Sequence, residues 1–318
     1  MRTFTYTSLL GLSLACLPPA AAPVSAAPPA GVVNDEALAR SFVAGLATIV
    51  DAGASQLLAA AITSREAADQ LAAAEGRQVR LPPSPTLCGL QPDQSLYDAV
   101  TPAVVVVGSI YKCNNCSDWH LGGMASGWLV ADSGLVVTNH HVFGEDGGHH
   151  FGVMTADGTV FPVTAIMAAD QAGDAAVARI DTGGRRLSAV PLGTRPACGE
   201  AVTVISHPAG RFYSLTKGVV SRYHRQPADS PVANGLRNAI GADATDAPVW
   251  MSVTADFAVG SSGGPVFNAN GEVVGMVSRT FASQAKRNHR RYGTFGNQMV
   301  FKDCVSLDTL LRLVDPAG

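Results

Sequence analysis

From about residue 98 onward, the chain alternates short β-prone runs with turn residues. Glycine, proline, asparagine and aspartate separate these runs, and no helical pattern alternates with them. Many short strands separated by turns are typical of an antiparallel barrel or sandwich, because a parallel sheet needs crossover helices. We therefore expect an all-β domain whose strands cover residues 103–110, 134–138, 159–166, 175–180, 201–205, 250–254 and 272–278.

Residues 34–76 have a different composition, rich in alanine and leucine and poor in β-branched residues. The first part has a helical period and a capping residue at Asn34 or Asp35. Its apolar face comprises Leu38, Phe42, Leu46 and Ile49. Thr63-Ser64-Arg65-Glu66 is a capping box and predicts a second helix that runs to about Glu75.

These patterns divide the chain into three parts. Residues 27–86 are expected to be a helical pro- or accessory segment followed by a stiff Pro-rich linker at 81–85. Residues 87–318 form the β domain, which closes with a short helix over 306–314. Residues 1–26 form a separate leader, described next.

The first 26 residues have the pattern of a signal peptide. Arg2 is the only charge, an apolar stretch runs from Leu9 to Leu17, and Val24-Ser25-Ala26 satisfies the small-residue rule for cleavage after Ala26. A competing interpretation makes Cys16 a lipidated cysteine. The apolar stretch is too short for a mature membrane span, and no other segment approaches one. We expect an exported protein, either periplasmic or secreted, without a membrane span.

Composition and charge exclude other classes. The chain is 318 residues long, 47% hydrophobic and 15% charged, which is too apolar for a disordered protein. Its formal net charge is −3 and no block of like charges is present, so we expect no nucleic-acid partner.

The cysteines leave alternatives open. Cys113-Asn114-Asn115-Cys116 followed by His120 has a spacing that metal sites use. A structural zinc site needs four ligands, however, and no second Cys/His pair follows at the usual distance. A local disulfide or partly free thiols are favoured in an oxidising compartment, and we predict no metal site and no cofactor.

Three short sequence segments contain the candidate catalytic residues. Thr138-Asn139-His140-His141-Val142 follows an apolar strand, Asp174 leads into another, and Gly260-Ser261-Ser262-Gly263-Gly264-Pro265 flanks serine with glycine. A serine nucleophile needs a base, which a histidine held by a carboxylate provides. The glycine-rich segment is also good hairpin-turn chemistry. The order His, Asp, Ser in a β-rich exported chain favours the catalytic interpretation.

Several segments resemble the chymotrypsin-fold (trypsin-like) serine proteases, nearest to the bacterial Deg, or high-temperature-requirement, peptidases. The resemblance covers about residues 96–280. Its motifs are Ala125–Val130 with Gly134–Asn139, Ile205–Gly210, Ser214–Ser221, the Gly260–Pro265 segment and Gly271–Ser278. It implies two six-stranded antiparallel β-barrels with a cleft between them. Too few residues follow Thr280 for a PDZ module, so we expect none.

The resemblance also implies residue roles. His141 and Asp174 would come from the first barrel and the nucleophile Ser262 from the second, with the N–H groups of Gly260 and Ser262 as the oxyanion hole. The strand Ser278–Thr280 would pair with the substrate. The residues implied for substrate binding are Asp256, Ser278, Arg279 and Thr280.

The position of Asp256, six residues before the nucleophile, is where trypsins carry the acid that selects Arg or Lys. Small aliphatic side chains at the substrate's P1 position are the alternative specificity.

The predicted function is an exported serine endopeptidase acting on protein or peptide substrates through an acyl-enzyme intermediate. Ser261 stands where the family pattern has Asn or Asp, which leaves a second hypothesis, a catalytically weak homologue that binds peptides in the same cleft. An esterase is disfavoured, because the chain lacks a G-x-S-x-G elbow and the Ser, Asp, His order.

Overall fold

The structure is a computed structural model that describes residues 32–53, 60–82, 95–113, 115–144, 149–225, 247–284 and 297–315. The predicted leader, Cys16, Cys88 and most of the predicted linker lie outside the described residues.

The first of two barrels is a closed, antiparallel sheet of six strands in the order β2-β3-β4-β7-β6-β5. Its strands pair with their sequence neighbours except where β7 joins β4 and β5 joins β2. The bounds are Val104–Lys112 (β2), Trp119–Ala131 (β3), Leu135–Thr138 (β4), His150–Met154 (β5), Val160–Asp170 (β6) and Ala175–Ile180 (β7).

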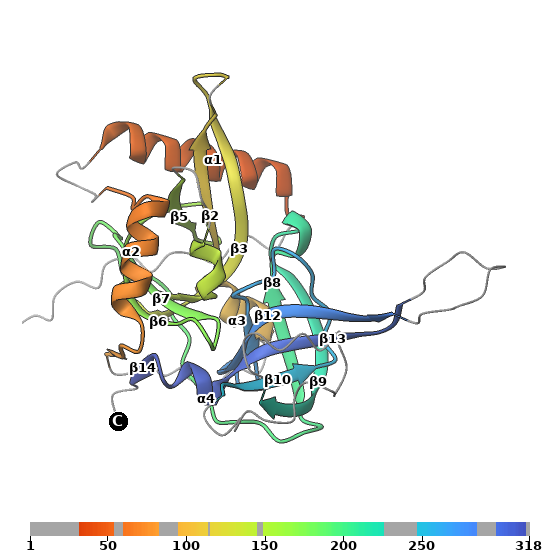
Figure 1. The fold of residues 1–318 in the computed structure, drawn as a ribbon. Helices are drawn as coiled ribbons and strands as arrows, with labels where there is room; N and C mark the ends of the chain where they lie inside the picture. Colours follow the sequence, from red (N-terminus) through yellow and green to blue (C-terminus); the bar gives the residue numbers. More distant parts are fainter. Residues whose placement is uncertain are drawn as a thin grey trace, which may run out of the picture.

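The second barrel is also closed and six-stranded, in the order β10-β13-β12-β11-β8-β9. The bounds are Ala201–Ser206 (β8), Ser214–Arg225 (β9), Val249–Val253 (β10), Pro265–Phe267 (β11), Val273–Gln284 (β12) and Asn297–Ser306 (β13). Figure 1 shows β12 and β13 extending together well beyond the barrel. The predicted chymotrypsin-like pair of barrels is confirmed.

Two helices cover the first barrel. Helix α1 (Asp35–Ala52) is capped by Asn34, whose side chain accepts from the Ala37 N–H. Helix α2 (Ser64–Ala74) begins with the predicted capping box between Thr63 and Glu66. Figure 1 shows α1 across the end of the barrel near β2 and β3, and α2 along the side formed by β6 and β7. No helix in the described ranges is long and apolar enough to cross a membrane.

These helices are part of the first barrel's packing. Phe42 and Leu46 of α1 are fully buried, and Leu71 of α2 joins the same hydrophobic core as Trp128. The side chain of Gln70 accepts a hydrogen bond from the Ile166 N–H of β6 at 2.7 Å. Burying two such α1 side chains contributes about 1.5–3 kcal/mol each, so we infer that α1 helps to stabilise the barrel.

The remaining short elements connect and close the barrels. Helix α3 (Leu96–Val100) and the 3₁₀ turn Thr101–Ala103 (η1) lead into β2. The predicted helix over 306–314 was too long: α4 covers only Leu307–Leu310. The chain then turns so that β14 (Val314–Asp315) pairs in parallel with β1 (Val79–Arg80). Because Val314 and Asp315 are paired with β1, the chain cannot continue as a helix to residue 314.

Candidate active site

His141 follows the end of β4 in a short 3₁₀ turn, His140–Phe143 (η2). The imidazole Nδ1 lies 2.9 and 3.0 Å from the two carboxylate oxygens of Asp174. The His141 backbone N–H also donates to Oδ1 of Asp174 at 3.2 Å. With its Nδ1 occupied by a carboxylate, the ring presents Nε2 for proton transfer.

Asp174 stands in the turn before β7, with a φ of +52° that non-glycine residues rarely adopt. The Asn139 side chain holds this conformation by donating to the Asp174 carbonyl at 2.7 Å. The Ser278 hydroxyl, from β12 of the second barrel, donates to Asp174 Oδ2 at 2.6 Å. The Asp174 carboxylate therefore joins groups from both barrels.

Ser262 lies in the turn before β11, within the glycine-rich segment. Its Oγ donates to the Ser278 carbonyl at 3.3 Å. Gly260 has a φ of +92°, and a Cβ there would lie 2.5 Å from the His207 carbonyl oxygen, so only glycine fits. Neither the Gly260 N–H nor the Ser262 N–H donates to a backbone carbonyl within the described residues.

Ser126 on β3 organises this loop, although sequence reasoning assigned it no role. Its hydroxyl donates to the Gly260 carbonyl at 2.9 Å and accepts from the His207 N–H at 3.0 Å. Its own N–H donates to the Ser262 carbonyl at 2.7 Å. Ser126 is fully buried, so these bonds are shielded from water. A first-barrel residue thus orients the peptide units on either side of Ser262.

The electrostatics of the two nearby histidines differ. Burial lowers the pKa of His141, but the hydrogen bond and charge of Asp174 outweigh it, and the pKa is raised above its ordinary value. Complete burial lowers the pKa of His207 to about 4. The His207 Nδ1 accepts from the Tyr213 N–H at 3.0 Å, which leaves the ring proton on Nε2. His207 is therefore neutral at pH 7 and packs against the glycine-rich segment that contains Ser262.

A pocket of about 270 Å³ opens beside these groups. His141, Gly260 and Ser262 line it together with residues from β2 and β3 of the first barrel. None of the four predicted substrate residues lines this pocket: Asp256, Ser278, Arg279 and Thr280.

The charges of two predicted substrate residues already have partners. Asp256 is largely exposed, and its carboxylate lies 3.5 Å from Lys302 Nζ. The Lys302 ammonium also donates to the Phe257 carbonyl at 2.6 Å. The Arg279 guanidinium lies 4.0 Å from the centre of the Trp250 ring and 3.8 Å from Asp303. A β-bulge at Ser278 interrupts the register of β12, and the Arg279 side chain beyond it packs on Trp250.

We compared the sequence with those of known proteins. Residues 125–276 match the family model described as a trypsin-like peptidase domain. Over about half of its length, the chain is therefore similar to trypsin-like peptidase domains. Its two barrels and the order of its site residues agree with this assignment.

Individual relatives are named as Deg-type proteases. The serine protease HhoA of Synechocystis sp. is 31% identical over 158 residues, which are 49% of this chain and 36% of the relative. Protease Do-like 5, chloroplastic, of Arabidopsis thaliana is 28% identical over 238 residues, 69% of this chain and 67% of the relative. A protein of Pseudomonas savastanoi named as a DegP-like periplasmic serine endoprotease is 34% identical over 163 residues, 50% of this chain and 29% of the relative. The match thus spans about a third of the length of HhoA and of the DegP-like protein.

The contacts of Ser126 generate a testable prediction. Ser126→Ala would leave the Gly260 carbonyl and the His207 N–H without their buried partner, and an unsatisfied buried group costs about 1–3 kcal/mol. We expect kcat for peptide hydrolysis to fall by about tenfold or more, with a smaller change in KM. Ser133→Ala, at an exposed turn position, is the matched control. Unchanged kcat in Ser126→Ala would show that this residue does not position the nucleophile loop.

Proposed function

We propose that this protein is an exported serine endopeptidase in which His141, Asp174 and Ser262 form the catalytic triad. The observation that carries the proposal is the Asp174 carboxylate, which binds His141 Nδ1 and the Ser278 hydroxyl next to Ser262. The trypsin-like peptidase domain and the Deg-type relatives support the same reaction class.

In the proposed reaction, Ser262 Oγ first rotates from the Ser278 carbonyl toward His141 Nε2. It attacks the peptide carbonyl carbon while His141 accepts its proton. The N–H groups of Gly260 and Ser262 stabilise the oxyanion of the tetrahedral intermediate. His141 then donates its proton to the leaving amine, which yields the acyl-enzyme. Water, deprotonated by His141, attacks the ester and releases Ser262.

Asp174 has two roles in this reaction. It holds the His141 proton on Nδ1, so that Nε2 is free to act as a base, and it stabilises the imidazolium that forms after proton transfer. Its own position depends on the Asn139 and Ser278 hydrogen bonds, because the φ of +52° is unfavourable without them.

For substrate binding, we propose that the strand Ser278–Thr280 pairs with the substrate backbone as an added strand. The P1 side chain is proposed to be small and uncharged. The ion pair between Asp256 and Lys302 supports this choice over Arg or Lys, since the Asp256 carboxylate already has a cationic partner. The Arg279 charge is likewise turned toward Trp250 and Asp303.

One contact favours the second candidate, a catalytically weak peptide-binding homologue. The Ser262 hydroxyl donates to the Ser278 carbonyl, so its rotamer is not the one that attack requires. Rotation about one bond separates the two rotamers. Whether substrate induces this rotation distinguishes an enzyme from a binding protein.

Export is the remaining part of the proposal. It is supported by the signal-peptide pattern of residues 1–26 and by the periplasmic description in the name of the DegP-like relative. We propose a periplasmic or secreted location.

Internally quenched peptides that differ only at P1 test the activity and the specificity together. We expect cleavage after Ala or Val to exceed cleavage after Arg or Lys, and Ser262→Ala to lower kcat by about 10⁴-fold or more. Ser133→Ala is the matched control. Binding of the peptides with no cleavage by the unmodified chain would support the peptide-binding candidate instead.

The raised pKa of His141 predicts the acid limb of the pH profile. The base acts when neutral, so activity should fall as the pH drops through a midpoint above the ordinary histidine value of about 6.5. Asp174→Asn removes the charge that raises this pKa, so the midpoint should move to lower pH. The same variant should lower kcat by about 10⁴-fold.

The measurement is kcat/KM against pH for the unmodified chain and for Asp174→Asn. Asp69→Asn, at an exposed position on α2, is the control for loss of a carboxylate elsewhere. An acid limb with the same midpoint in Asp174→Asn would contradict the proposed pairing.

A further inference from the structure

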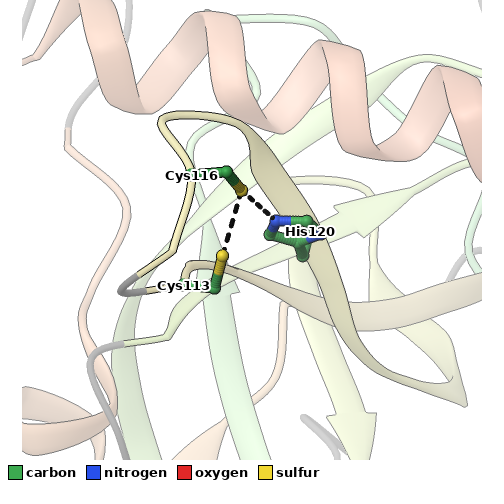
Figure 2. Close-up of side chains that lie close together, drawn as sticks. All are labelled: Cys113, Cys116 and His120. Carbon is green, nitrogen blue, oxygen red and sulfur yellow. Dashed lines mark hydrogen bonds between the residues drawn. The ribbon is translucent and has the colours of Figure 1, made fainter.

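Three potential metal ligands meet at the end of the β2–β3 hairpin. Cys113 and Cys116 lie in the connecting loop and His120 lies near the start of β3, and Figure 2 shows their side chains pointing toward one another. Cys116 Sγ lies 3.0 Å from Cys113 Sγ and 2.8 Å from His120 Nε2. The three donor atoms all lie within 4.8 Å of one another.

We propose that Cys113 Sγ, Cys116 Sγ and His120 Nε2 bind a Zn²⁺ ion, with water as the fourth ligand. Two thiolates and an imidazole are a donor set that zinc prefers. Catalytic zinc sites bind the ion with three protein ligands and a water, so a site of that open type does not need a second Cys/His pair.

The spacing of the three atoms fits the ion. With Zn–S distances of about 2.3 Å and Zn–N distances of about 2.0–2.1 Å, tetrahedral geometry separates ligand atoms by about 3.5–3.8 Å. The two hydrogen-bonded separations must widen by less than about 1 Å to reach these values. Two of the ligands are on a short loop, where small rotations of side chains supply such a change.

Backbone N–H groups surround both sulfur atoms. Backbone N–H groups of Asn115 and Cys116 hydrogen-bond the Cys113 sulfur, and the Asp118 N–H hydrogen-bonds the Cys116 sulfur. Hydrogen bonds to ligand sulfurs are a usual outer shell of thiolate metal sites. The His120 ring packs against Tyr111, its cross-strand partner, with ring centres 5.5 Å apart.

The base of the loop is fixed before any ion binds. Lys112 and Trp119 are cross-strand partners that directly precede Cys113 and His120. Both contact Asp51 of α1: the Trp119 Nε1–H donates to its carboxylate at 3.1 Å, and Lys112 Nζ lies 3.5 Å away. Because both ends of the loop are held against α1, binding an ion costs less ordering of the chain.

The site is distinct from the proposed active site, since none of the three ligands lines the pocket beside Ser262. Cys116 is exposed and Cys113 and His120 are partly exposed, so an ion reaches them directly from solvent. The four described cysteines form no disulfide. A Cys113–Cys116 disulfide, which the sequence also allowed, would use two of the three converging donors and leave His120 without a role.

Cobalt titration of the reduced full chain tests the proposal. We expect one equivalent of Co²⁺ to produce thiolate-to-cobalt charge-transfer absorption, and Zn²⁺ to displace it. Cys116→Ser and His120→Ala should each weaken binding by about 100-fold or more, while Cys198→Ser, which removes another exposed cysteine, should leave it unchanged. Circular dichroism of each metal-free variant verifies that it is folded.

Three results would overturn the proposal. They are the absence of charge-transfer absorption, equal Co²⁺ affinity in folded Cys116→Ser or His120→Ala, and formation of a Cys113–Cys116 disulfide in air at the same rate with and without Zn²⁺. The last is measured by peptide mass mapping. All three leave the proposed peptidase activity untouched, because no residue of the triad is altered.

Discussion

The proposed site depends on the hydrogen bonds that the Asp174 carboxylate accepts. This carboxylate binds the imidazole and backbone N–H of His141 within the first barrel and the Ser278 hydroxyl from the second. A carboxylate that accepts three donors satisfies most of its hydrogen-bonding capacity, and this offsets the unfavourable backbone conformation of Asp174. Without the Ser278 hydrogen bond, the Asp174 carboxylate would be held from the first barrel alone.

A second set of contacts across the same junction fixes the glycine-rich loop that carries Ser262. Ser126 of β3 binds the carbonyls of Gly260 and Ser262, and a Cβ on Gly263 would lie 2.1 Å from the Ser126 carbonyl oxygen. The loop therefore packs directly against the first barrel, and glycine is needed for that approach. The first barrel in turn buries Phe42 and Leu46 of α1 in its core. The barrel that supports the Ser262 loop thus shares its core with an N-terminal helix.

Sequence analysis predicted the elements that depend on local sequence patterns and the fold that the family resemblance implied. Alternating apolar runs predicted β7 at its observed bounds, the capping box predicted the start of α2, and the resemblance predicted the two barrels. The predicted strand ranges omitted β3, β5 and β13, among others. In β13, Lys302 and Asp303 look unsuited to a barrel strand. These charges are accommodated by partners distant in sequence: Phe257 and Asp256 for Lys302, and Ser252 and His224 for Asp303. The roles of Ser126 and the convergence of His120 on the two cysteines also arise only from strand pairing.

The central claim is that the two barrels assemble an activated serine. Labelling of the full chain with a fluorophosphonate, followed by peptide mass mapping of the adduct, tests it most directly, because the reagent needs a nucleophile, a base and an oxyanion hole together. We predict modification of Ser262 in the unmodified chain and its loss in His141→Ala. An unlabelled protein that is folded, or an adduct that persists in His141→Ala, would contradict the assignment of the triad.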